Sequence, residues 1–235
     1  MNWYYRARIA FKLKSTLREL RLRSIHLPRL RAIYLTTPKV AGSTIMATLI
    51  KADASERFAG IADYNSRDAR HRLSSEAAPR AFWRDLHDPE CFRFTFVRNP
   101  YDRAVSAYLD KIATGKVSRK KKLLGYPPDS EVSFRDFLLA IAQQEASRMN
   151  RHWRPQSALI SPQVKLDFIG RFEQFGRDFA NVLERLDVEP AAVTNRREHM
   201  TSAAKHRDMI GPEEKALIDR IYRGDFERFG YAMTL

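Results

Sequence analysis

Two short apolar runs dominate the pattern of hydrophobic and polar positions. The first, residues 32–35, leads into a turn that contains Pro38 and Gly42, and a longer apolar run at 45–50 follows that turn. The second, residues 92–97, is dense in the aromatic and β-branched side chains that suit a buried strand. Each run leads through a short loop into a segment with helical spacing. The pattern therefore predicts two units of strand, loop and helix.

The helix after the second strand has clear boundary residues. Asn99 is a good helix cap, and Pro100 suits the first helical position. The same kind of pattern predicts further helices and one more strand, over residues 134–149, 179–186 and 212–221 for the helices and 168–172 for the strand. Alternating strands and helices favour one α/β domain with a central parallel sheet flanked by helices, and with its site at the carboxyl ends of the strands.

The loop after the first strand has the composition of an anion site. Residues 38–44 read Pro-Lys-Val-Ala-Gly-Ser-Thr. Glycine lets the backbone approach a ligand, and the free N–H groups at a helix start favour phosphate. Lys39 adds a mobile positive charge, but it precedes Gly42, whereas the lysine of a Walker A loop directly follows the last glycine. This order disfavours an ordinary nucleoside triphosphatase. Taken alone, the loop can also be a tight connection between strand and helix that binds no anion.

Cationic and hydroxyl side chains also follow the second strand. Arg98 comes at its carboxyl end, and Asp102, Arg103 and Ser106 lie on the helix face that points back toward it. A guanidinium and a hydroxyl that converge at a strand end suit a phosphate monoester. Two alternatives stay open here: Arg98 can be a surface ion-pair partner of Asp102, and Arg103 can hold Asp102 or a helix end rather than a ligand.

These segments resemble a known family of enzymes. The Pro-Lys-x-Ala-Gly-Ser-Thr loop, followed by Phe-Val-Arg-Asn-Pro-Tyr-Asp-Arg-x-Val-Ser-Ala-Tyr, is similar to the sulfotransferases that use 3′-phosphoadenosine 5′-phosphosulfate (PAPS), in their carbohydrate branch. The resemblance continues through residues 150–156, 167–173 and 222–231. It implies a P-loop-like domain that moves a sulfuryl group from PAPS to a hydroxyl of a saccharide. Both a neutral and an acidic saccharide stay open as the acceptor.

The resemblance also implies which residues bind the donor. Arg98 and Ser106 would hold its 3′-phosphate, and Lys39 would stabilise the charge that grows on the leaving phosphate oxygen. The residues that would hold the 5′-phosphosulfate are Pro38, Lys39, Ala41, Gly42, Ser43 and Thr44.

The base that takes the proton of the acceptor hydroxyl is expected to be a histidine, because the pKa of histidine lies near working pH. His71 and His87 both lie between the two phosphate motifs, where related sulfotransferases often have an acceptor-side base. His71 is favoured, because the neighbouring Arg70 and Arg72 favour its neutral form. His152, in the downstream motif, remains a further alternative, and each of the three can also be a plain surface histidine.

The net charge indicates which classes of partner to expect, and the cysteine and histidine content bears on disulfides and metal sites. The net charge of +14 and the pI of about 10.1 predict anionic partners: the nucleotide donor, an acidic saccharide, or a membrane or nucleic-acid surface. The single cysteine, Cys91, excludes an internal disulfide and a cysteine-rich metal site. No histidine pair with helical metal-ligand spacing is present either, so we expect no metal.

The N-terminal residues 1–31 are basic and amphipathic, and we expect a helical segment there, followed by the sulfotransferase domain at 32–235. This helix either packs on protein or lies on an anionic membrane surface. Arg and Lys interrupt its apolar runs too often for a secretory signal or a membrane span. We therefore expect a cytoplasmic protein, with peripheral contact at the inner membrane surface as an alternative.

Two other functions fit part of the sequence. A P-loop-like nucleotide or sugar kinase would use ATP and magnesium, but the Gly-Lys-Ser/Thr order that it needs is missing. A basic nucleic-acid-binding protein would explain the charge and leave both anion motifs without a role. We therefore expect no nucleic-acid partner.

Overall fold

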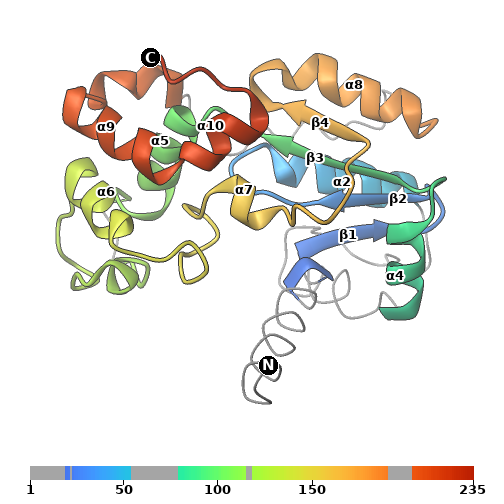
Figure 1. Ribbon diagram of the computed structural model, residues 1–235, viewed down its shortest axis with the longest axis horizontal. Helices are drawn as coiled ribbons and strands as arrows, with labels where there is room; N and C mark the ends of the chain where they lie inside the picture. Colours follow the sequence, from blue (N-terminus) through green and yellow to red (C-terminus); the bar gives the residue numbers. More distant parts are fainter. Residues whose placement is uncertain (1–18, 22, 54–78, 115–117, 190–202) are drawn as a thin grey trace, which may run out of the picture.

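The computed structural model describes residues 19–21, 23–53, 79–114, 118–189 and 203–235, which form an α/β domain around a four-stranded sheet (Figure 1). The strand order is β1-β2-β3-β4, with β2, β3 and β4 parallel and β1 antiparallel to β2. The strands are β1 (Ser24–Leu27), β2 (Ala32–Leu35), β3 (Phe92–Val97) and β4 (Phe168–Arg171). The predicted α/β class is confirmed, and β1 makes the sheet mixed rather than wholly parallel.

Strand β1 is the main difference from the sequence prediction. It lies inside the expected helical segment 1–31, yet all four of its residues are buried and pair with β2. Its polar side chains find partners: Ser24 Oγ donates to Leu20 O at 2.8 Å, and His26 Nε2 lies 2.7 Å from Asp85 Oδ2. Pairing with β2 outweighs the weak local preference of Ser-Ile-His-Leu for a strand. Of the rest of the expected segment, residues 1–18 and 22 lie outside the described residues.

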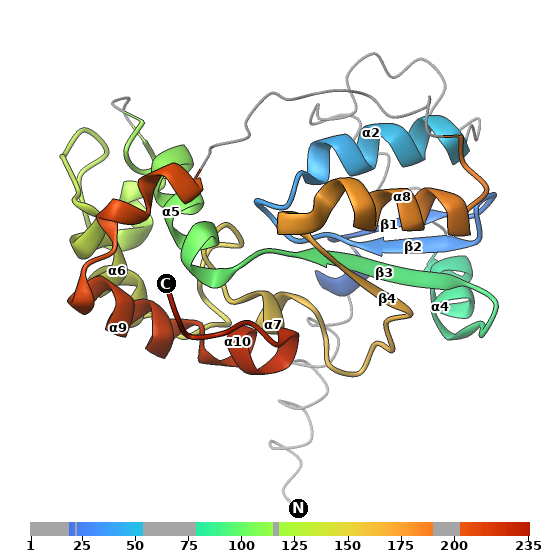
Figure 2. The same ribbon diagram turned by 90° about the horizontal axis from the view of Figure 1, so that it is seen from above.

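Helices cover both faces of the sheet. Figure 2 shows α2 (Gly42–Asp53) and α8 (Phe175–Arg185) on one face and α4 (Pro79–His87) on the other. Alternate residues of β2 enter the two resulting cores, because successive strand side chains point to opposite faces. Tyr34 packs in the core with α2 and α8, while Ile33 packs in the core with α4.

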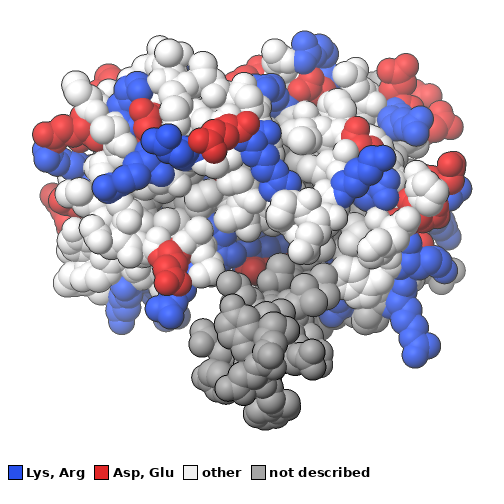
Figure 3. Space-filling model, viewed as in Figure 1, with Lys and Arg blue, Asp and Glu red and all other residues white. Residues whose placement is uncertain are grey.

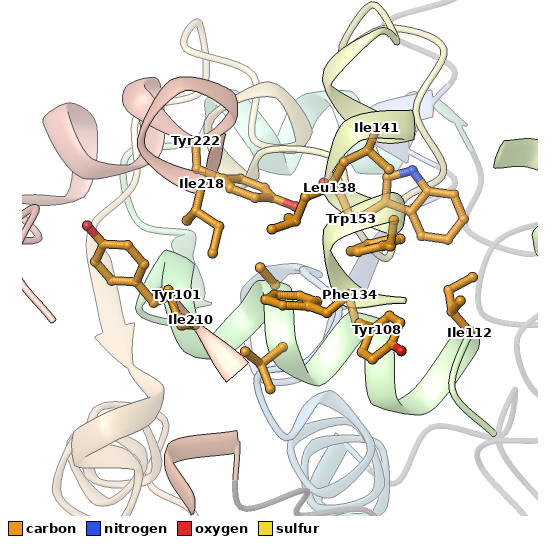
Figure 4. Packing of buried hydrophobic residues seen from close by; sticks show 14 of the residues in the cluster. Tyr101, Tyr108, Ile112, Phe134, Leu138, Ile141, Trp153, Ile210, Ile218 and Tyr222 are labelled. Atoms are coloured by element: carbon orange, nitrogen blue, oxygen red, sulfur yellow. Dashed lines mark hydrogen bonds between the residues drawn. The ribbon is translucent and has the colours of Figure 1, made fainter. Parts of the chain in front are cut away.

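A second group of helices packs beside the sheet, next to the carboxyl ends of β2, β3 and β4 (Figure 1). Its core, shown in Figure 4, is built around Tyr108, Phe137 and Trp153, and Trp153 is fully buried with its ring edge-on to Phe137. The helices of this group are α5 (Pro100–Lys111), α6 (Phe134–Ala142), α7 (Gln156–Leu159), α9 (Pro212–Ile221) and α10 (Arg223–Phe229). Short 3₁₀ helices lie at Lys121–Leu124 (η2), Phe172–Gln174 (η3) and Ala203–Met209 (η5).

Helix α5, which follows β3 directly, starts as the sequence indicates. The Asn99 side chain accepts a hydrogen bond from Tyr101 N at 2.9 Å, and Pro100 lies in the first turn. The helix predicted over 134–149 is shorter and ends at Ala142. A strand end and a capped helix start therefore meet at Arg98 and Asn99.

Gly170, in β4, is a position where a side chain does not fit. A Cβ there would lie 2.4 Å from the ring of Phe96, which is itself fully buried between aromatic neighbours. Crowding of a packed core costs about 1–3 kcal/mol, and we expect Gly170→Ala to lower the free energy of unfolding by that amount. Urea unfolding measures it. Gly176→Ala is the matched control, since a Cβ at Gly176 meets nothing within 4 Å; equal midpoints for the two variants would contradict the prediction.

Candidate functional site

The loop between β2 and α2 turns through two strained residues. Lys39 and Ala41 have left-handed backbone, with φ of 75° and 58°. Such a conformation costs a non-glycine residue about 1–2 kcal/mol, and strain of this kind clusters at ligand sites. The start of α2 supports the turn, because Thr44 N and Ile45 N both donate to Ala41 O, at 3.0 and 3.2 Å. The left-handed positions are therefore Lys39 and Ala41, and not the glycine at 42.

The side chain of Lys39 is paired with a carboxylate. Its Nζ lies 2.9 Å from Oδ2 of Asp110, near the end of α5, and only 9% of the side chain is exposed. Nζ of Lys111 lies 3.0 Å from the same oxygen. Burial lowers the pKa of Lys39, and the hydrogen bond and charge of Asp110 oppose that change. Lys39, predicted as the cation of the site, thus already binds an anionic group.

Arg98, at the carboxyl end of β3, is buried and linked to this loop. Its Nη1 donates to Lys39 O at 3.2 Å, and its guanidinium lies over the ring of Phe172, 4.3 Å from the centroid. Only 4% of the residue is exposed, so Arg98 does not lie on the surface. Burial lowers its pKa, against the charges of Asp102 and Glu173. The structure therefore joins the two predicted phosphate motifs.

Gln156, the last residue of the 150–156 motif, fixes the backbone on both sides of Arg98. Arg98 N donates to Gln156 Oε1, and Gln156 Nε2 donates to Arg98 O, each at 2.9 Å. Gln156 is fully buried, and Asp225 Oδ2 accepts a hydrogen bond from its backbone N at 2.8 Å. Gln156 had no predicted role, although the resemblance of its motif to the family could have indicated one.

Helix α5 carries three further polar residues of the second predicted phosphate motif, and the charges of Asp102 and Arg103 act on Arg98. Asp102 accepts two hydrogen bonds from Arg207 of η5, at 2.8 and 3.0 Å, and Ser106 is fully buried. Arg103, whose role the sequence left open, is fully buried and donates to the backbone: Nε to Pro38 O at 3.4 Å and Nη2 to Arg151 O at 3.2 Å. Arg103 therefore braces the Lys39 loop against the 150–156 segment.

The three candidate histidines end up in different places. His71 lies outside the described residues. His87 is exposed at the end of α4, where its Nδ1 lies 2.7 Å from Trp83 O. Helix α4 lies at the opposite end of the sheet from α5 (Figures 1 and 2), so the structure does not bring His87 together with Lys39 and Arg98.

His152 shares charged neighbours with Lys39. Burial, together with the positive charges of Lys111, Arg151 and Lys120, lowers the pKa of His152 to about 3, against the opposing charge of Asp110. Because Asp110 and Lys111 also form the ion-pair group of Lys39, the imidazole and the Lys39 ammonium share a neighbourhood. Among the described residues, its Nδ1 is buried and has no hydrogen-bond partner. His152 therefore remains neutral across the neutral pH range.

On the face in Figure 3, acidic and basic side chains are interspersed, so this face has no continuous cationic stripe of the kind that follows a nucleic-acid backbone. Within the described ranges, no group of three or more His, Cys, Asp or Glu could hold a metal ion.

Comparison with known proteins identifies the family. A family model described as Sulfotransferase family matches residues 24–232. The chain belongs to this sulfotransferase family. Its match to carbohydrate sulfotransferases confirms the predicted branch. The family match includes β1, which lies before the expected domain start at residue 32.

Three relatives show how far the likeness extends. Carbohydrate sulfotransferase 14 of Homo sapiens is 30% identical over 183 residues, which are 69% of this chain and 46% of that protein. Carbohydrate sulfotransferase 14 of Danio rerio is 26% identical over 236 residues, 86% of this chain and 60% of that protein. Carbohydrate sulfotransferase 12 of Xenopus laevis is 26% identical over 202 residues, 68% and 47% of the two chains. The chain thus spans about half the length of the curated relatives it matches. No solved structure matches it.

These relatives contradict the expected location. The sequence favoured a cytoplasmic protein, with peripheral contact at the inner membrane surface as an alternative, whereas the carbohydrate sulfotransferases that the chain resembles are Golgi membrane enzymes. The prediction was wrong because it rested on the lack of an apolar span in residues 1–31, and such a lack does not define a compartment. In the described parts of the chain, too, no helix has the length and apolar character to cross a membrane.

Proposed function

We propose that the protein transfers the sulfuryl group of PAPS to a hydroxyl of a saccharide. The observation that carries this proposal is the hydrogen bond from Arg98 Nη1 to Lys39 O, at 3.2 Å. It links the side chain of Arg98 to the backbone of Lys39, and these two cationic residues follow the neighbouring parallel strands β3 and β2. Two cations at one sheet edge suit a nucleotide with phosphate at both its 5′ and 3′ positions. Membership of the family supports sulfuryl transfer as the chemistry.

The first loop fits the 5′-phosphosulfate. Lys39 pairs with an anionic group already, and α2 starts at Gly42, so the positive end of that helix lies at the loop. When bound, PAPS supplies the reacting sulfur, and Lys39 would stabilise negative charge on the phosphate oxygen that leaves. The proposed binding residues of this loop are Pro38, Lys39, Ala41, Gly42, Ser43 and Thr44.

Arg98 and Ser106 are the proposed site for the 3′-phosphate. Arg98→Ala should weaken binding of the product nucleotide, 3′-phosphoadenosine 5′-phosphate (PAP), by about 30-fold, as expected for a lost charge-assisted contact worth about 2 kcal/mol. Calorimetry measures the affinity. Arg98→Lys is the matched variant, since it keeps the positive charge and loses the bidentate geometry of the guanidinium. Its affinity for PAP should lie between those of the wild type and of Arg98→Ala. An Arg98→Ala protein that melts normally and binds PAP as well as the wild type would exclude this role.

For the acceptor side, we propose His152 as the base and an acidic saccharide as the acceptor. His152 is neutral and shares its neighbours Asp110 and Lys111 with Lys39. The nearby cations, Lys111, Lys120 and Arg151, help to lower its pKa. Negative charge on the donor and on the acceptor would offset these cations and raise the basicity of His152 when both are bound. His71, favoured by the sequence, stays a prediction, and so does His87, which has no support from its position on α4.

A screen with sulfur-labelled PAPS tests the proposal. We expect label in one or more acidic polysaccharides, with neutral polysaccharides as the matched set, and release of PAP in equal amount. Transfer of phosphate from ATP with magnesium, in place of sulfuryl transfer, would favour the kinase alternative. Retention on DNA with a steep dependence on salt, and no transfer, would favour the nucleic-acid alternative.

A further inference from the structure

Asp110 is the residue of the site whose role the proposed function leaves unexplained. Its Oδ2 accepts from Lys39 Nζ at 2.9 Å and lies 3.0 Å from Lys111 Nζ. The side chain of Asp110 is partly exposed, at 28%, while that of Lys39 is almost covered, at 9%. The carboxylate thus binds the ammonium group that the donor is proposed to use.

The carboxylate and the phosphosulfate cannot both lie against Lys39 without cost. Both groups are anionic, and like charges that share one cation repel strongly where water is largely excluded. Lys39 is therefore better paired with one of them at a time. Lys111 makes an exchange feasible, because it stays bonded to Asp110 and leaves no unpaired carboxylate behind when Lys39 departs.

We propose that Asp110 is a positioning residue that holds Lys39 in the donor-free protein and releases it to the 5′-phosphosulfate when the donor binds. This inference rests on the proposed function. No covalent bond changes in this step: one ion pair, Lys39 with Asp110, is replaced by another, Lys39 with the donor. Asp110 then keeps its contact with Lys111. The exchange reduces donor affinity by the free energy of the pair that is lost, and it keeps Lys39 ordered before the donor arrives.

The test is the affinity for PAP, measured by calorimetry, of the wild type and of Asp110→Asn. The amide keeps the shape of the carboxylate and removes its charge, so Lys39 no longer has to be taken from an anion. We expect PAP to bind about fivefold more tightly to Asp110→Asn, a gain that a merely damaged site would not show. Asp110→Ser makes the same measurement if the amide variant does not fold.

Two controls define the result. Glu90→Gln changes net charge equally but lies in the turn before β3, at the other end of the sheet, and should leave PAP affinity within about twofold of wild type. In a Lys39→Ala background, Asp110→Asn should give almost no gain, because the cation that links Asp110 to the donor is gone.

The outcomes separate the two proposals. A wild-type protein that binds PAP, together with Asp110 variants that bind it equally or more weakly, would overturn the role of Asp110 and leave the proposed function intact. The same gain with and without Lys39 would also overturn it, since Asp110 would then act on the donor directly. A wild-type protein that does not bind PAP would remove both proposals.

Discussion

Lys39→Ala is expected to lower turnover by about two orders of magnitude while PAP affinity falls by less than about tenfold. The reason is that the Lys39 charge matters most when the bond between sulfur and the bridging oxygen breaks, and PAP no longer has that bond. Electrostatic stabilisation in a dry site is often worth about 3 kcal/mol, which corresponds to the expected loss of rate. Turnover at saturating donor and calorimetry with PAP measure the two quantities.

The matched control is Lys51→Ala, which removes an exposed lysine at the end of α2, the helix that follows the Lys39 loop. This variant should keep turnover close to that of the wild type. Should Lys39→Ala retain turnover within about threefold of wild type, Lys39 is not the cation on the leaving oxygen. An equal loss in turnover and in PAP affinity would assign it to ground-state binding instead.

His152→Ala is expected to lower the rate by about two to four orders of magnitude, the usual contribution of positioned proton transfer, with PAP affinity nearly unchanged. His71→Ala and His87→Ala complete the comparison. His87→Ala should be mild, because His87 is exposed at the far end of the sheet. If His71→Ala is inactive and His152→Ala active, the base belongs at His71 and the donor site is unaffected.

The pH dependence of kcat/KM distinguishes the same candidates. A base is active when it is neutral, so activity falls as pH drops through its pKa. The pKa of His152 is lowered to about 3 by burial and nearby cations, so a His152 base predicts no loss of kcat/KM between about pH 7.5 and 5.5. An ordinary histidine would lose activity near pH 6.5. A fall there that disappears in His71→Ala would therefore support His71.

The sequence predicted those parts of the fold that local patterns determine. Strand β2 is apolar throughout, β3 is rich in aromatic and β-branched residues, and the helix after β3 has its cap at Asn99, so these elements were predicted. Strand β1 was missed because its burial depends on pairing with β2 and on distant partners such as Asp85 for His26. The local sequence of the strand does not indicate such contacts.

The motifs in the sequence indicated the residues of the candidate site. They did not indicate the long-range contacts that these residues make. Arg98 and Lys39 were expected together because each follows a strand, and the hydrogen bond between Arg98 Nη1 and Lys39 O joins them. The brace formed by Arg103 and the clamp formed by Gln156 connect residues 48 to 65 positions apart. The pairing of Lys39 with Asp110 spans 71 positions, and no spacing rule relates such residues.

The central claim is that the site recognises a nucleotide by both of its phosphates, and the most direct measurement compares PAP with 5′-AMP by calorimetry on the wild-type protein. This comparison needs no knowledge of the acceptor. PAP should bind more tightly by about tenfold or more, because the proposed contacts of Arg98 and Ser106 are made to a phosphate that 5′-AMP lacks. Equal affinities for the two nucleotides would contradict the account.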